Sequence, residues 1–135
     1  MDLVIRSAPL ASGVRAVTIA LVADVVLVVV FAAVGRASHD EVLTVAGVLQ
    51  TLWPFLVGLV AGWLVMLGWR RPFGPLRTGA GVWAVTVAGG MLLRMASGEG
   101  TAVAFVIVAA VTLLVFLVGW RLIVAAVRGR QKGAS

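Results

Sequence analysis

Four long apolar stretches, separated by clusters of charge, limit what this chain can fold into. The first holds 20 residues with one acid, Asp24, and the next three hold 28, 16 and 21 uncharged residues; they lie at 16–35, 42–69, 78–93 and 100–120. A helix needs about 20 residues to cross the ~30 Å hydrocarbon core of a bilayer. A membrane barrel would show short alternating segments instead. The stretches therefore predict a membrane protein built from helices.

The expected fold class is all-α: a polytopic membrane protein whose four transmembrane helices form two helical hairpins in one bundle. The expected helices lie at about 14–35, 42–69, 78–97 and 101–123. The transmembrane domain would span 14–127, between an N-terminal tail at 1–13 and a basic C-terminal tail at 128–135. The first stretch is longer than the core of a secretory signal, which has about 7–15 residues, so we expect it to remain as an uncleaved span.

Basic residues are distributed unevenly between the two ends of these helices. Only Arg36 and Arg94 flank one end, whereas nine flank the other: Arg6, Arg15, Arg70, Arg71, Arg77, Arg121, Arg128, Arg130 and Lys132. Because positively charged loops stay in the cytoplasm, both termini are expected inside, at the inner (plasma) membrane. This bias argues against an inverted dimer with dual topology, so a homo-oligomer would be parallel.

Composition narrows the chemistry further. The chain has no cysteine and a single histidine, His39. It therefore lacks thiol catalysis, cysteine metal sites and a bis-histidine haem within one subunit. The net charge of +6 is read as topology, so membrane lipids are expected as partners and nucleic acid is not. Without a recognisable nucleophile and base, no catalytic residue, metal or cofactor is assigned, and the balance leans away from an enzyme.

Asp24 is the sharpest candidate for a functional side chain, because it lies nine residues into the first stretch, near the expected bilayer centre. A charge there costs about 2.5–3.5 kcal/mol on insertion scales, and such residues face the bundle interior or a water-filled path. One interpretation is a carboxylate that binds a proton or cation in a permeation path. The other is a structural hydrogen bond to Thr86, Thr18 or a tryptophan indole. Both stay open.

A second group of candidates lies at the two turns that are expected outside. Arg94 is expected to reach outward to an acid such as Glu99 rather than inward to Asp24, since snorkelling is cheaper than burying an ion pair. Together, 36–41 and 94–101 would form a polar vestibule able to hold a lipid phosphate or an anionic substrate. A plain interface anchor is the alternative for Arg94. The candidates for ligand or ion binding are Asp24, Arg94, Arg36, His39, Glu41 and Glu99.

The start of the second helix is a further prediction. Ser38 and Glu41 have capping-box spacing, which predicts a helix beginning at His39. A helix that filled the whole interval up to the middle loop would be ~46 Å long, too long for one straight span. Pro54 therefore indicates either a kink or a short interfacial helix at 39–50 before the true span.

Several phrases of the sequence resemble a known family. They cover about residues 20–123 and read GRASHDEVLTVAGVLQTLWPFLVGLVAGW, RRPFGPLRTG, MLLRMASGEGTAVAFVIVA and FLVGWR. They are similar to the small actinobacterial membrane proteins grouped as domain of unknown function 3054. The resemblance implies an integral membrane protein with an actinobacterial source. It implies no substrate, cofactor or catalytic residue.

The leading functional hypothesis is a small transport-like or ligand-binding bundle, with Asp24 buried below the polar vestibule. The alternative is a non-catalytic accessory or assembly subunit of a larger membrane complex, and a lipid-modifying enzyme ranks third. The accessory role would use small residues at four-residue spacing, which let helices approach closely in lipid. These residues are Gly58 and Gly62 in the second helix and Ala80, Ala84 and Ala88 in the third.

Overall fold

The computed structural model describes the backbone of residues 2–38 and 44–134 and the side chains of residues 13–37 and 44–130. Within this part the chain is helical apart from short connections. The elements are α1 (Asp2–Ser38), α2 (Val45–Val65), the 3-10 turn η1 (Gly68–Arg70), the π-turn η2 (Pro75–Gly79), α3 (Ala80–Ala96) and α4 (Val103–Ala134). Within the described residues, four segments are long and apolar enough to cross a membrane: Gly13–Ala37, Val45–Val65, Pro75–Ala96 and Val103–Arg130. The all-α, four-helix membrane class is therefore confirmed.

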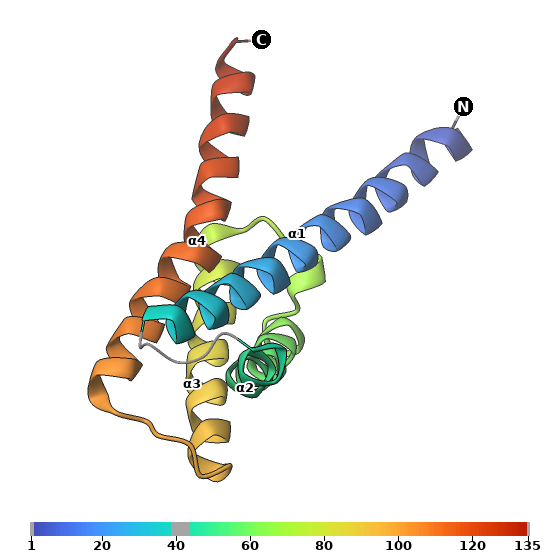
Figure 1. The fold of residues 1–135 in the computed structure, drawn as a ribbon. Coiled ribbons are helices and arrows are strands. Elements are labelled where there is room, and N and C mark those ends of the chain that lie inside the picture. The colour runs from blue at the N-terminus through green and yellow to red at the C-terminus, as the bar shows by residue number, and fades with distance from the viewer. Residues whose placement is uncertain (1, 39–43, 135) are drawn as a thin grey trace.

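The two ends of the molecule differ in what they carry. α3 and α4 run alongside each other and α1 runs obliquely to them, with both chain termini at the same end (Figure 1). The segment that joins α2 to α3, with η1 and η2, also lies at this end. The turn from α3 to α4 lies at the opposite end. Polar groups near the termini and polar groups near that turn are thus separated by the length of the bundle.

The core forms where α2 packs on the other helices, above all on α3. Gly58 and Gly62 permit this approach: a Cβ at Gly58 would lie 2.7 Å from the Thr86 carbonyl oxygen, and one at Gly62 would lie 3.1 Å from the Val82 carbonyl oxygen. The small residues of α2 therefore pack inside the bundle. The fully buried apolar side chains around this contact include Val28, Phe55, Leu59, Val82, Leu113 and Leu117.

The beginning of α2 differs from the sequence prediction. Ser38 is the last residue of α1, and Thr44 is the N-cap of α2, with its Oγ1 accepting from the Gly47 N–H at 3.0 Å. The prediction that Ser38 caps the second helix is therefore wrong, because α1 continues through that residue. His39, Asp40 and Glu41 lie outside the described residues.

The structure also shows how the second apolar stretch, which is too long for one straight span, is accommodated. α2 is one continuous helix of 21 residues that contains Pro54, so residues 45–50 do not form a separate interfacial helix. The chain leaves the helix after Val65, and Leu67 adopts a left-handed backbone with φ 52°. This turn, three residues before Arg70, limits α2 to the length of a single span.

Candidate functional site

The most densely bonded polar cluster joins Asp24 of α1 to Arg121 of α4. Both side chains are fully buried. Arg121 Nη2 lies 2.7 Å from Asp24 Oδ2, and Nη1 lies 2.9 Å from Oδ1. This is the bidentate arrangement in which a planar guanidinium binds a carboxylate most strongly. The contact fastens the first helix to the last.

Two indoles and two backbone carbonyls complete the bonding of this pair. Trp63 Nε1 and Trp120 Nε1 each donate to the Asp24 carboxylate at 2.9 Å. Arg121 also donates to the Pro72 carbonyl at 2.9 Å and to its own helix, at the Leu117 carbonyl, at 2.7 Å. A buried charge is tolerated only when it is paired and hydrogen-bonded. We call Asp24, Trp63, Trp120 and Arg121 the ion-pair cluster.

The partners of Asp24 correspond only in part to the expectation. The predicted hydrogen bond between Asp24 and a tryptophan indole is confirmed. Thr18, another predicted partner, donates instead to the Val14 carbonyl at 2.9 Å. Thr86 Oγ1 is buried without a hydrogen-bond partner among the described residues. Pro72 belongs to the α2–α3 connection, so the carboxylate lies toward the end that carries the termini.

Arg121 was missed because it was counted among the charges of the inner loops. A signal was present in the sequence: six apolar residues, LIVAAV at 122–127, follow Arg121, so the charge lies inside an apolar stretch instead of at its end. The indole of the adjacent residue, Trp120, also donates to Asp24. Excluding Arg121 leaves eight basic residues that flank the termini-bearing ends of the helices, against Arg36 and Arg94.

Arg94, at the end of α3, turns away from Asp24. Its Nη1 lies 2.9 Å from Glu99 Oε2, and Nε and Nη2 donate to the Gly100 carbonyl at 3.2 and 3.0 Å. Its guanidinium also lies 4.3 Å from the centroid of the Phe105 ring. The prediction that Arg94 pairs with an acid of the turn is confirmed. These contacts hold Arg94 against the connection from α3 to α4.

Arg36 reaches from α1 to α2 at the same end of the molecule. Its Nη1 donates to Thr51 Oγ1 at 3.3 Å, and the guanidinium packs on Gly47, where a Cβ would lie 2.5 Å from Nη2. The two arginines open onto one hollow of about 330 Å³, here called the two-arginine hollow, which is lined by Arg36, Gln50, Thr51, Arg94, Glu99 and Gly100. The structure thus brings Arg36, Arg94 and Glu99 together and leaves Asp24 apart from them.

The chemistry of these side chains suits anions. Among the described residues, no group of three or more His, Asp or Glu side chains could hold a metal ion. Guanidinium groups with hydroxyl and amide neighbours bind carboxylates and phosphates through charge-assisted hydrogen bonds. His39 and Glu41, also expected in the vestibule, lie outside the described residues, so their contribution stays a prediction.

Comparison with known proteins identifies the family. A family model described as "Protein of unknown function (DUF3054)" matches residues 21–124, and the chain belongs to this family. The predicted family is therefore confirmed, and the actinobacterial source stays a prediction. The matched residues include the ion-pair cluster and the two-arginine hollow. Neither a curated protein nor a solved structure matches the chain significantly.

Proposed function

We propose that this DUF3054 protein is a ligand-binding protein of the plasma membrane that takes a small anion at the two-arginine hollow. The observation that carries the proposal is that two guanidinium groups, from α1 and α3, open onto one hollow whose lining includes a single acid, Glu99. Its volume of about 330 Å³ falls within the ~300–1,000 Å³ range of small-molecule pockets. An anion with two carboxylates could pair with both guanidinium groups.

Glu99 would act as an internal competitor for this ligand. Arg94 carries five N–H groups, and three of its nitrogens already donate to Glu99 and to the Gly100 carbonyl. Two N–H groups therefore remain for a ligand. An incoming anion would share Arg94 with the Glu99 carboxylate and be repelled by it. Neutralising Glu99 should then strengthen binding, while neutralising either arginine should weaken it.

In this proposal Asp24 fastens the helices together and is not the ligand site. Its carboxylate accepts four hydrogen bonds and has no exposed surface. An ion that passed through this position would displace Arg121 and leave a buried guanidinium without its counter-ion, at a cost of several kcal/mol. Binding at the two-arginine hollow is therefore better supported than transport past Asp24.

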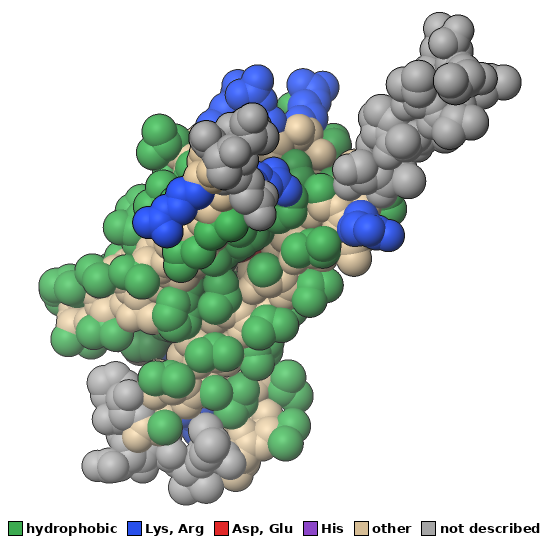
Figure 2. Space-filling model, turned by 90° about the horizontal axis from the view of Figure 1, so that it is seen from above, with side chains coloured by type: hydrophobic (Ala, Val, Ile, Leu, Met, Phe, Trp, Pro, Cys, Tyr) green, Lys and Arg blue, Asp and Glu red, His purple; other side chains and the backbone are tan. Residues whose placement is uncertain are grey.

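The proposed orientation places both termini in the cytoplasm and the two-arginine hollow on the outer side. Lys and Arg side chains gather over the end that carries the termini, and no described acidic side chain is in sight there (Figure 2). Described arginines of this end include Arg15, Arg70, Arg77 and Arg130. Cytoplasmic ends of membrane proteins carry such an excess of basic residues. A ligand would then reach the hollow from outside the cell.

Calorimetric titration of the full chain in phosphatidylcholine nanodiscs with succinate, a simple dicarboxylate, tests the proposal. We expect Arg36→Gln and Arg94→Gln each to weaken binding about tenfold or more, since a charge-assisted hydrogen bond contributes about 1.5–3 kcal/mol. Glu99→Gln should strengthen it. The control Arg130→Gln removes an exposed charge far from the hollow and should change affinity less than twofold. Equal affinity in all four variants, or no saturable binding, would overturn the proposal.

Native purification separates this proposal from the accessory-subunit hypothesis. That hypothesis relied on small-residue stripes, but Gly58 and Gly62 face α3 within the bundle, which leaves only Ala84 and Ala88 exposed. We expect the protein to purify alone or as a parallel homo-oligomer. A foreign membrane protein present in stoichiometric amount would favour the accessory role instead.

A further inference from the structure

A second hollow lies at the opposite end of the molecule, where the chain passes from α2 to α3. It encloses about 230 Å³ and is lined by Met66, Leu67, Arg70, Arg71, Arg77 and Thr78. We propose that this three-arginine hollow binds a phosphate group, either of a phospholipid headgroup or of a soluble phosphate. The inference is independent of the function proposed for the two-arginine hollow, because the two sites share no residue.

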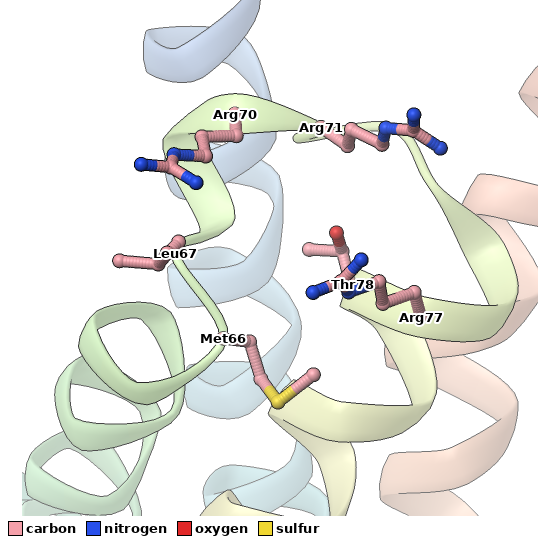
Figure 3. A pocket seen from close by; sticks show the side chains of 6 residues that line it. All are labelled: Met66, Leu67, Arg70, Arg71, Arg77 and Thr78. Atoms are coloured by element: carbon pink, nitrogen blue, oxygen red, sulfur yellow. The ribbon is translucent and has the colours of Figure 1, made fainter.

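The charges of the three-arginine hollow are unbalanced. None of its six lining residues is acidic, and Arg70, Arg71 and Arg77 form no ion pair or hydrogen bond with another described side chain. The Arg77 side chain lies in the space below the arch formed by residues 66–72, while Arg70 and Arg71 stand on the arch and extend from it in opposite directions (Figure 3). Like charges gathered around one cavity raise its positive potential and attract an anion.

Membrane orientation alone does not explain this arrangement. The preference for basic residues on the cytoplasmic side requires charges near that interface, but it does not require them to surround one cavity. Arg15 and Arg130 are also basic and exposed, yet they lie on helix surfaces and line neither the three-arginine hollow nor the two-arginine hollow. Arg15 and Arg130 therefore serve as controls for the arginines of the hollow, because they carry the same charge at positions away from it.

The arch above the hollow is attached to the ion-pair cluster at two points. Buried Gly68 presses against the Trp63 ring, where a Cβ would lie 2.6 Å from Cε3, and Trp63 in turn donates to Asp24. Four residues further on, the Pro72 carbonyl accepts from Arg121 Nε at 2.9 Å. These contacts hold the arch in shape before a ligand arrives. A preformed site loses less conformational freedom on binding.

The lining favours phosphate over other anions. Guanidinium groups present paired donors that match phosphate oxygens. The Thr78 hydroxyl oxygen points up toward the arch, where it could add a further hydrogen bond (Figure 3). A volume of about 230 Å³ is below the ~300 Å³ at which pockets begin to take drug-sized ligands, so it suits one headgroup or one ion. Met66 and Leu67 give the hollow an apolar edge suited to a lipid.

The test compares two double variants of the full chain that lose the same charge. Arg70→Gln with Arg77→Gln removes two arginines of the hollow, and Arg15→Gln with Arg130→Gln removes two from exposed helix surfaces. One arm titrates inorganic phosphate into protein in phosphatidylcholine nanodiscs by calorimetry. The other arm measures the rise in melting temperature when phosphatidylglycerol replaces part of the phosphatidylcholine. Circular dichroism reports whether each variant is folded.

We expect the hollow variant to lose tenfold or more in phosphate affinity, or most of the phosphatidylglycerol effect, and the surface variant to change less than threefold. A response in the phosphate arm identifies a soluble phosphate as ligand, and a response only in the lipid arm identifies a headgroup. Equal losses in both variants, or no response in either arm, would overturn the proposal. If the hollow variant does not fold, the single variant Arg77→Gln is compared with the single variant Arg130→Gln, and equal binding by these two would overturn the proposal.

Discussion

Neutralising Asp24 tests whether the ion-pair cluster holds the bundle together. In Asp24→Asn the side chain keeps its size but offers one acceptor oxygen and one NH₂ donor group. Two of the four N–H groups that now point at the carboxylate would then face a donor. Arg121, fully buried, would also lose the carboxylate that neutralises it.

The expected loss follows from the burial of both charges. Removing one partner of a buried ion pair costs about 3–5 kcal/mol, whereas a neutral hydrogen bond between membrane helices averages ~0.6 kcal/mol. We therefore expect Asp24→Asn to lower the free energy of unfolding by about 3–5 kcal/mol, and Arg121→Met to lower it by a similar amount. The double variant removes both charges. Its loss should fall short of the sum of the single losses by about 2 kcal/mol or more, as for residues in direct contact.

Reversible unfolding of the purified protein measures these losses, in mixed micelles of dodecyl maltoside and increasing dodecyl sulfate. Circular dichroism follows the helices, and tryptophan fluorescence follows the five tryptophans, which include Trp63 and Trp120 of the cluster. Thr18→Ala is the control, because among the described residues this exposed hydroxyl bonds only to the Val14 carbonyl of its own helix. It should stay within about 0.5 kcal/mol of wild type. A loss below about 1 kcal/mol in Asp24→Asn, or single losses that simply add, would refute the reasoning.

Three further predictions concern helix packing, capping and orientation. Gly58→Ala should lower the free energy of unfolding by about 1–3 kcal/mol, because its Cβ would lie 2.7 Å from the Thr86 carbonyl oxygen. In the control Gly119→Ala the new Cβ meets nothing within 4 Å, so the free energy of unfolding should stay within ~1 kcal/mol of wild type. Equal losses in the two variants would contradict the close approach of α2 and α3. Thr44→Ala should cost about 0.5–2 kcal/mol by removing the cap of α2, and Thr44→Ser should restore most of it; no loss in the alanine variant would argue against the cap. Because the chain has no cysteine, single cysteines report orientation directly: a membrane-impermeant maleimide should label Ser97→Cys in intact cells and Arg130→Cys only after lysis, and the reverse pattern would invert the proposed topology.

The helices could be predicted from the sequence because lipid imposes one strict requirement. Backbone groups in the hydrocarbon cannot bond to water, so each apolar stretch must satisfy them within its own helix, and the length of the stretch sets the span. The outward direction of Arg94 followed from the same reasoning, since an arginine near the end of a span reaches its acid more cheaply in the turn than in the interior. The start of α2 could not be predicted, because Ser38 and Thr44 are both acceptable caps and only the continuation of α1 decides between them.

By itself the sequence determined a four-helix membrane protein, an uneven distribution of charge and one acid that needed a partner. Only the tertiary structure decided which partner Asp24 has. Arg121 is 97 residues away in the sequence. Whether its guanidinium contacts Asp24 or points to solvent depends on how α1 and α4 are rotated and shifted against each other. The same holds for the two hollows, because each is built from separate segments whose arginines meet only when the helices pack. Hydropathy is a property of each helix alone, whereas these contacts depend on the packing of one helix on another.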